Sequence, residues 1–361
     1  MKLAILGDLH YGVRNDSEIF YHYQKLFFDN VFFPAIKERN IKNCFQLGDF
    51  FDRRQYINFK TLQFFYSYFP DMLNELDLDM HVLLGNHDVA LKSSNHINSP
   101  NLLLSDIDRI KVIQTCQDYT ITEGNEKYTV GICSWINNGN YAESIKYIES
   151  TKCPYLLGHF EINGFELHKG HVCDHGMETD IFEKFIKVIS GHFHTRGQAK
   201  NILYTGTPYE LSWNDWNDQK GFYILDTDTH EMEFIPNPYN MFCKIDYHNY
   251  INGNQILNIV PDCETVTGKY VKLICHKKED DSLFESYSKK LLSEMPIDLQ
   301  VSLSTVFSDV DSNEISSAGK TISDLIIENV NVANDELYSE IVKKSTIDLL
   351  LNLHNELNTV R

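Results

Sequence analysis

Five short segments in the first 194 residues combine Asp, His or Asn with a neighbouring glycine. They read Gly7-Asp8-Leu9-His10, Gly48-Asp49-Phe50-Phe51-Asp52, Gly85-Asn86-His87-Asp88, Gly158-His159 and Gly191-His192-Phe193-His194. Carboxylate, imidazole and amide groups bind metals, and two divalent ions about 3.5–4 Å apart can clamp a phosphate and activate a water molecule. The five segments together therefore predict a two-metal phosphoesterase site.

The spacing inside the segments suits shared ligands. Asp8 and His10 are two residues apart, so in an extended segment both side chains project to the same side. His192 and His194 repeat this arrangement, and Asp49 is the natural bridging carboxylate. Mixed oxygen and nitrogen donors without a thiolate favour Mn²⁺, Fe²⁺ or Zn²⁺ over Mg²⁺ or Ca²⁺.

Each segment follows a short apolar run that stops at the glycine. The runs are Leu3–Leu6, Cys44–Leu47, His81–Leu84, Tyr155–Leu157 and Lys187–Ile189. Their β-rich composition predicts strands with the polar segments at their carboxyl ends. Up to about residue 236 such runs alternate with helical stretches, Ser17–Arg39 and Asn140–Ser150, which is typical of a layered α/β domain. Further strand patterns at 202–205, 221–226 and 231–235 predict a second sheet packed on the first.

The motifs stop near residue 236, which predicts four parts: a phosphoesterase domain at 1–236, a small α/β module at 237–308, a polar linker at 309–320 and a helical segment at 321–361. The small module contains a strand pattern at 270–275, a helix pattern at 282–294 and a strand pattern at 297–307. The last helix, predicted over 335–358, has an apolar stripe formed by Tyr338, Val342, Leu349, Leu353 and Leu357. Burying that stripe requires folding back, a second copy or another protein's helix.

The order of the five segments resembles the calcineurin-like metallophosphoesterase superfamily. Within it, Gly7–His10, residues 158–165, His175-Gly176, and 191–195 followed by 204–208 resemble the SbcD-type recombination nucleases, in particular their short form in T-even bacteriophages. The resemblance is strong to about residue 236 and extends to the tail only in outline. It implies a four-layer αββα sandwich and a DNA exonuclease and endonuclease of recombination and double-strand break repair. It also implies a homodimer and an SbcC-like coiled-coil ATPase as partner.

The family pattern also implies roles for individual residues. It places Asp8, His10, Asp49 and His194 on one ion, and Asp49, Asn86, His159 and His192 on the other, with Mn²⁺ as the metal. His87 is implied to meet the scissile phosphate and assist the leaving oxygen, with Asp88 orienting its ring. Asp52 stands where other members carry His, so no second phosphate contact is assigned to it.

Three further groups of candidate residues each have two possible interpretations. The loop 165–178 contains His168, His171, Cys173 and His175. Their close spacing resembles a zinc site, but the loop lies between two metal motifs, and we expect His175 near the rim of the active site or simply in an exposed loop. The basic residues nearest the motifs are candidate phosphate contacts or ordinary solvated side chains: Arg53, Arg54, Lys92, Lys169 and Arg196. The helical stripe Phe59, Leu62, Phe65, Tyr66 and Phe69 is either a homodimer contact, by the family resemblance, or core packing.

Composition limits the class of protein. The chain has 361 residues, of which 42% are hydrophobic and 12% aromatic, enough for a real core. It has no signal-peptide pattern and no apolar run of about 18 residues, so we expect a cytoplasmic protein, in the host cell if the source is a phage. The eight cysteines are scattered, which favours reduced core residues. A net charge of −19 is unfavourable for DNA binding and suggests that a partner supplies positive surface.

Three functional classes remain open from the sequence. The first is a metal-dependent DNA exonuclease and endonuclease. The second is a metallophosphoesterase that acts on cyclic nucleotides, phosphomonoesters or phosphoproteins, and the third is a scaffold without activity. No ligand position of the motif set is missing, which counts against the scaffold. The tail beyond residue 236, needed neither for metal binding nor for small substrates, favours the nuclease.

Overall fold

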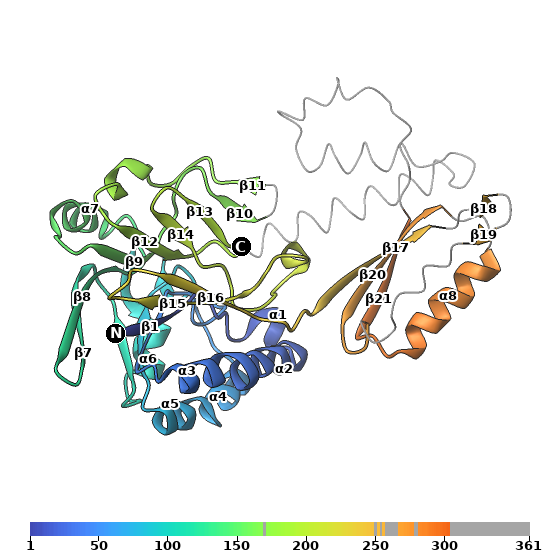
Figure 1. The fold of residues 1–361 in the computed structure, drawn as a ribbon, viewed down its shortest axis with the longest axis horizontal. Coiled ribbons are helices and arrows are strands. Elements are labelled where there is room, and N and C mark those ends of the chain that lie inside the picture. The colour runs from blue at the N-terminus through green and yellow to red at the C-terminus, as the bar shows by residue number, and fades with distance from the viewer. Residues whose placement is uncertain (169–170, 249–250, 253–254, 257–265, 278–280, 304–361) are drawn as a thin grey trace, which may run out of the picture. The chain divides into compact units, whose positions relative to one another are not determined.

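A computed structural model of the chain describes residues 1–168, 171–248, 251–252, 255–256, 266–277 and 281–303 (Figure 1). The predicted linker at 309–320 and the helical segment at 321–361 lie outside these residues. Within the described part, no helix combines the length and the apolar composition needed to cross a membrane.

The first sheet has six strands in the order β16-β15-β1-β2-β3-β6. Their bounds are β1 Lys2–Leu6, β2 Asn43–Gln46, β3 Asp79–Leu83, β6 Ile110–Ile113, β15 Gly221–Asp226 and β16 Met232–Pro236. Strands β1, β2, β3 and β6 run parallel, so their carboxyl ends meet at one edge of the sheet. Strand β15 pairs antiparallel with β1, and β16 pairs antiparallel with β15 at the edge of the sheet.

The second sheet also has six strands, in the order β13-β14-β12-β9-β8-β7. Their bounds are β7 Gln117–Glu123, β8 Glu126–Cys133, β9 Tyr155–His159, β12 Lys187–Gly191, β13 Gly197–Ala199 and β14 Ile202–Tyr204. The central strands β8, β9, β12 and β14 are parallel. The polar segments that follow β9 and β12 therefore also leave the sheet at one edge.

Alternating side chains of each strand enter different apolar layers. In β1, Leu3 and Ile5 pack between the two sheets, whereas Ala4 and Leu6 face the helices that cover the first sheet. In β9, Leu157 lies between the sheets and Leu156 faces the opposite outer layer. Both faces of each sheet are buried, which explains why the strands are apolar runs rather than strictly alternating patterns.

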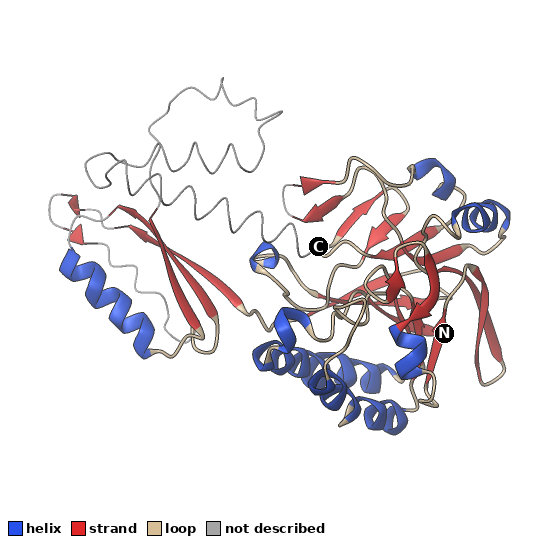
Figure 2. Ribbon diagram, turned by 180° about the vertical axis from the view of Figure 1, so that it is seen from behind, coloured by secondary structure: helices blue, strands red, loops and turns tan. Residues whose placement is uncertain are grey.

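Helices form the two outer layers (Figure 2). The first sheet is covered by α2 Glu18–Phe27, the π-helix η1 Phe28–Phe32, α3 Phe33–Arg39, α4 Phe59–Tyr66 and α5 Phe69–Leu76. The second sheet is covered by α7 Tyr141–Ser150 and the 3-10 helix η2 Thr179–Phe182. The predicted four-layer αββα sandwich is confirmed.

A small α/β module follows the sandwich in sequence. Its three-stranded sheet has the order β17-β20-β21, with all strands parallel, and it includes one helix. The elements are β17 Phe242–His248, β20 Tyr270–Lys277, α8 Asp281–Ser293 and β21 Asp298–Leu303. The predicted strand at 270–275, helix at 282–294 and strand from 297 are confirmed as far as residue 303, and residues 304–307 lie outside the described part. Strand β17 is an addition that the sequence pattern did not indicate.

The remaining elements are short. They are α1 Val13–Asp16, β4 Val89–Leu91, β5 Ser94–Asn98, α6 Ser99–Leu104, β10 Glu166–His168, β11 His171–Val172, η3 Trp213–Asp215, β18 Ile251–Asn252 and β19 Gln255–Ile256. Strands β4 and β5 form a hairpin, as do β10 and β11.

Three expectations need correction or refinement. The strands at 221–226 and 232–236 belong to the first sheet, because β15 returns to pair antiparallel with β1; of the three late strands only β14 lies in the second sheet. In the aromatic stripe, Phe65 and Phe69 are core residues, whereas Phe59 is 87% exposed. The stripe is thus partly core and partly surface.

The expectation that all cysteines are reduced is wrong for one pair. Cys116 and Cys133 form a disulfide, because the register of β7 and β8 places Gln117 opposite Ile132 and so brings the two cysteines side by side. They are 17 residues apart in sequence, and that spacing carries no local signal. The free cysteines of the described residues are Cys44, Cys153, Cys173, Cys243 and Cys275.

Candidate metal centre

The seven predicted ligands lie at the carboxyl ends of five strands. Asp8 and His10 follow β1, Asp49 follows β2, Asn86 follows β3, His159 ends β9, and His192 and His194 follow β12. Strands β1, β2 and β3 are neighbours in one sheet, and β9 and β12 are neighbours in the other. The two sheets therefore bring ligands from distant parts of the chain to one end of the sandwich.

Asp8, His10 and His194 form the first ligand group. Nε2 of His10 lies 3.1 Å from Nε2 of His194, and each of these nitrogens lies 3.9 Å from Oδ2 of Asp8. The Asp8 carboxylate also accepts a hydrogen bond from the backbone N–H of His192 at 3.0 Å. This bond fixes the carboxylate and ties the loop after β1 to the loop after β12.

His159, Asn86 and His192 form the second group. Nε2 of His159 lies 3.0 Å from Oδ1 of Asn86, and the ring centroids of His159 and His192 are 5.0 Å apart. Asp49, His159 and His192 offer ligand atoms within 4.8 Å of one another.

Asp49 lies between the two groups. Its Oδ2 is 3.7 Å from Nε2 of His10 in the first group and 3.6 Å from Nε2 of His159 in the second. Its Oδ1 accepts a hydrogen bond from the backbone N–H of His87 at 2.7 Å. One oxygen is thus held by the backbone while the other faces both groups, an arrangement in which this oxygen could contact two ions.

The second nitrogen of two of the imidazoles faces an oxygen atom. Nδ1 of His159 donates to the carbonyl oxygen of Leu47 at 2.7 Å, which leaves the Nε2 lone pair facing Asn86 and Asp49. Nδ1 of His10 lies 3.3 Å from Oδ1 of Asp52. A carbonyl or carboxylate behind the ring is the usual support of a metal-binding histidine. Asp52, for which the sequence suggested no role, therefore lies at ion-pair distance behind the His10 ring.

Glycine is required where the ligand loops approach one another. A Cβ atom on Gly85 would lie 2.2 Å from Oδ1 of Asp49, and one on Gly191 would lie 2.5 Å from Oδ1 of Asp8. Neither neighbour can withdraw, because both carboxylates belong to the site. This close approach explains why a glycine accompanies the predicted ligand segments.

Three ligand residues adopt the left-handed backbone region, with φ of 47° at His10, 53° at Asp49 and 85° at His192. Such conformations are costly outside glycine and persist only where the surroundings hold them. Here the Asp49 carbonyl oxygen accepts the N–H groups of Leu9 and His10 at 3.1 and 3.0 Å. The backbone of the β2 loop thus holds the β1 loop in place.

Burial and neighbouring charges shift the pKa values of the side chains in the site. Burial disfavours charge on Asp49, but the neighbouring histidines His159, His87 and His10 outweigh it and hold the pKa of Asp49 below its usual range. Burial lowers the pKa of His159, and it lowers that of His192 to about 3. These two imidazoles are therefore neutral at pH 7, as metal binding requires.

The pKa values of Asp8 and His10 shift in the opposite direction, toward the protonated form. Burial beside Asp49 raises the pKa of Asp8 well above its usual range. Burial would lower the pKa of His10, but the carboxylates of Asp52, Asp49 and Asp8 raise it to about 9. The site combines several buried carboxylates with a few imidazoles. Bound cations would balance the negative charge of these carboxylates. The donor set of imidazole, carboxylate and amide groups, without a thiolate, fits divalent transition ions.

His87 faces a cleft next to the ligands. The cleft has a volume of about 430 Å³, and its lining includes His87, His10, His194, Arg14 and Arg53. Nδ1 of His87 lies 2.6 Å from the carbonyl oxygen of Asp52, to which it donates, so Nε2 is left for a ligand in the cleft.

Asp88 does not orient the ring of His87, contrary to expectation. Its Oδ1 accepts the N–H groups of Phe50 and Phe51, and its Oδ2 accepts the N–H of Gly85 at 2.8 Å. Asp88 is fully buried. It joins the loop after β2 to the loop after β3 and is a positioning residue for Asp49.

The five basic candidates separate into different environments. Arg53 lines the cleft but is also paired with Asp16 at 2.9 Å. Arg54 and Lys92 line a second cavity that reaches His159. Arg196 instead donates to Gln219 and lies over the ring of Phe234. Lys169 lies outside the described residues.

The histidine-rich loop is placed at the edge of the site. Nε2 of His175 lies 3.2 Å from Oε1 of Glu161, and Glu161 lines the cavity that reaches His159. Cys173, Glu161 and His175 offer atoms within 4.8 Å of one another, but the sulfur of Cys173 donates to the carbonyl of His175. The position of His175 agrees with the expected rim, and His171 is exposed.

Sequence reasoning missed several residues around the centre. Lys220 is buried and donates to the carbonyl oxygen of His194 and to Oδ1 of Asp215, both at 2.7 Å. The ring of Trp135 lies 5.3 Å from that of His192, measured between centroids. Arg14 lines the cleft beside His87. Neither Lys220 nor Trp135 lies in a polar motif, and no local signal marks them.

Known proteins resemble this chain in the region that builds the centre. Residues 1–196 match the family of calcineurin-like phosphoesterases. The chain is 34% identical over 262 residues to exonuclease subunit 1 of Enterobacteria phage T4, which covers 70% of this chain and 75% of that protein. The recognised resemblance to the phage recombination nucleases is therefore confirmed.

Solved structures are more distant. An archaeal phosphodiesterase is 14% identical and aligns with 66% of this chain and all of its own, with a TM-score of 0.32. GAP50, the anchor in the inner membrane complex of Plasmodium, is 10% identical over 66% of this chain and 90% of its own, with a TM-score of 0.36. These scores are too low to bear on the assignment, which rests on the family match and the phage relative. The chain belongs to the calcineurin-like phosphoesterase family.

Proposed function

We propose that this chain is the nuclease subunit of a DNA-processing enzyme of recombination and double-strand break repair, and that it hydrolyses phosphodiesters with two divalent ions, Mn²⁺ being the expected metal. The observation that carries this proposal is the position of the Asp49 carboxylate, 3.7 Å from one ligand group and 3.6 Å from the other. The relation to a phage exonuclease subunit supports DNA as the substrate.

The ligand sets assign a task to each residue. Asp8, His10 and His194 would hold one ion, Asn86, His159 and His192 the other, and Asp49 both. When bound, the ions supply Lewis-acid activation of the phosphodiester and of the attacking water.

His87 would serve the leaving group. Donation from Nδ1 to the Asp52 carbonyl holds the ring in one orientation. In the protonated ring the N–H group of Nε2 faces the cleft. Its positive charge can stabilise the phosphate, and its proton can be transferred to the departing oxygen. Because Asp88 is committed to three backbone N–H groups, the Asp52 carbonyl fixes the ring instead.

A second copy of the chain is the partner that we propose for an exposed apolar surface. This dimer surface consists of large side chains on and around α4, β4, β5 and α6: Tyr56, Phe59, Leu91, Ile97 and Leu102. Several of them line a mainly apolar hollow of about 340 Å³ between α4 and α6. Contiguous apolar surface of this kind is typical of an interface.

We also propose an ATPase partner of the SbcC-like coiled-coil class. The relative is described as a subunit, which supports an assembly. The chain carries 51 acidic and 32 basic side chains, so a partner with positive surface would strengthen DNA binding. The apolar stripe of residues 335–358, outside the described residues, is the segment that we assign to this contact.

The nuclease proposal is tested by comparing substrates with Mn²⁺ present. We expect hydrolysis of end-labelled DNA and of bis(p-nitrophenyl) phosphate, and little hydrolysis of p-nitrophenyl phosphate. His87→Asn should lower turnover by about 10²–10⁴, because a positioned proton donor is lost, while the metal content stays unchanged. The exposed His96 provides a control, and His96→Asn should match the wild type. Faster hydrolysis of the monoester than of DNA would favour the small-substrate class.

The metal assignment is tested at the shared carboxylate. Asp49→Ala should lose both ions, because the two cations then repel each other without a shared anion. Asp49→Asn keeps an oxygen to accept the His87 N–H and should also lose metal, whereas His194→Ala should weaken mainly one ion. Metal content is measured by elemental analysis after dialysis, with circular dichroism to check folding. Two tightly bound ions and full turnover in Asp49→Asn would contradict the bridging role.

The proposed dimer is tested by placing charged residues in its interface. Phe59→Glu with Leu102→Glu should convert a dimer into a monomer, because each carboxylate would be buried against apolar surface. Light scattering after size exclusion measures the mass. Leu292→Glu, at an exposed leucine on α8, is the matched control and should remain dimeric. A wild-type monomer at high protein concentration would refute the proposal.

The ATPase contact is tested by truncation. Deleting residues 309–361 should leave a chain that still hydrolyses bis(p-nitrophenyl) phosphate, because every proposed ligand lies before residue 195. It should no longer co-purify with the ATPase when the two are co-expressed. Undiminished complex formation would exclude this segment as the contact, and insolubility of the truncated chain would indicate that the stripe folds back on its own chain.

A further inference from the structure

A second cavity opens beside the proposed metal centre. Its volume is about 510 Å³, within the range of pockets that bind small organic groups. His159 forms part of its wall, so the cavity and the proposed metal centre share one side chain. Its other lining residues come from the loops after β2, β4, β8, β9 and β11 and from the start of α7.

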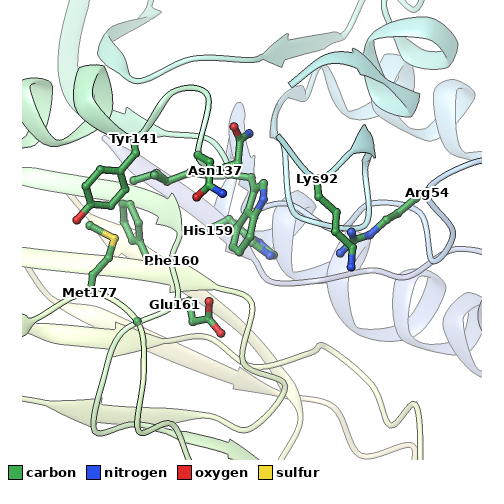
Figure 3. Close-up of a pocket in the computed structure, with 12 residues that line it drawn as sticks. Arg54, Lys92, Asn137, Tyr141, His159, Phe160, Glu161 and Met177 are labelled. Carbon is green, nitrogen blue, oxygen red and sulfur yellow. The ribbon is translucent and has the colours of Figure 1, made fainter. Parts of the chain in front are cut away.

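One end of this cavity is aromatic and apolar. Tyr141, Phe160 and Met177 lie together there (Figure 3). Tyr141 is 53% exposed, whereas Phe160 is buried, so the tyrosine ring is the part of this end that a ligand can cover. Trp135 continues the wall toward the metal centre, with its ring 5.8 Å from that of His159 between centroids.

The opposite end is cationic. Arg54 and Lys92 point toward each other there (Figure 3). Among the described residues neither side chain has a hydrogen-bond or ion-pair partner, whereas the adjacent Arg53 is paired with Asp16. Two uncompensated cations beside one another are unusual in a chain of net charge −19, and they form a site for an anion.

We infer that this cavity binds one unpaired nucleotide of the DNA strand, next to the phosphodiester that is cut. The inference rests on the proposed nuclease function. The phosphate at His159 would be the scissile one, the base would cover Tyr141, and the neighbouring phosphate would meet Arg54 and Lys92. An aromatic surface combined with a positive groove is the general means of holding single-stranded nucleic acid. A base inside a duplex is stacked on both sides and cannot enter, so the site selects single-stranded or frayed ends.

The cavity would hold the base without reading its identity. The side chain of Asn137 already donates to Asn95 and accepts from the N–H of Gly139. Glu161 is paired with His175. Because Asn137 and Glu161 are engaged inside the protein, we assign the main contact to stacking, and every base offers a face for stacking. The four bases should therefore be cut at similar rates.

The test compares a single-stranded oligonucleotide with one that carries an abasic residue beside a defined cleavage position. The wild type should cut the abasic strand about tenfold more slowly, because one base–aromatic contact is lost. Tyr141→Ala should slow cleavage of the intact strand about tenfold relative to the same variant's hydrolysis of bis(p-nitrophenyl) phosphate. It should show no further loss on the abasic strand. Tyr141→Phe should restore the wild-type pattern, and Ile186→Ala, an equally exposed apolar residue outside the cavity, is the matched control.

The cationic end is tested separately. Lys92→Ala should weaken binding of the single strand and reduce the salt dependence of its affinity by about one counterion. Lys127→Ala, at an exposed lysine outside the cavity, should change neither the affinity for the single strand nor its salt dependence.

The two proposals fail in different ways. A wild type that hydrolyses bis(p-nitrophenyl) phosphate but no DNA refutes the nuclease function. A wild type that cuts DNA with equal rates on intact and abasic strands refutes the base site and leaves the nuclease function standing. An abasic penalty that persists in Tyr141→Ala also refutes the base site as assigned.

Discussion

The structure of the site depends on the contacts of one buried carboxylate. Asp49 shares an oxygen between two ligand groups, accepts the N–H of His87 with its other oxygen, and accepts the N–H groups of Leu9 and His10 with its backbone carbonyl. A single residue therefore joins the loops after β1, β2 and β3. A buried anion is stable only when it is hydrogen-bonded and balanced by charge, and both conditions are met here by groups that serve the proposed reaction.

The packing of the two sheets makes this arrangement possible. The ligands of the first sheet meet His159 and His194 of the second only because the apolar layer between the sheets sets their spacing. The positive φ angles at His10 and Asp49 show that the loops are held rather than relaxed. Asp88 and Lys220 supply part of that restraint through backbone groups of the ligand loops. The geometry of the proposed site thus depends on side chains outside the set of proposed ligands.

Charge is distributed unevenly in this acidic chain. Four cations, Arg14, Arg53, Arg54 and Lys92, line the two cavities that reach the centre. Local positive charge can position a phosphate without making the whole surface attractive to DNA, because interactions beyond about 10 Å are screened by salt. The positioning of one phosphate and the overall affinity for DNA can therefore depend on different residues. This agrees with the proposal that a partner subunit strengthens DNA binding.

The sequence alone determined eight of the sandwich strands, the polar segments at the ends of five of them and the seven residues that the structure brings together, because strand patterns and motifs such as Asp8-Leu9-His10 are local signals. It did not indicate strands β6, β7, β8 and β13. Tertiary structure alone decided the partners of Asp88, the disulfide between Cys116 and Cys133, and the cavity lined by Tyr141. Each of these depends on which distant segments become neighbours. Sheet order and loop packing decide which segments become neighbours. The residues adjacent in sequence do not indicate it.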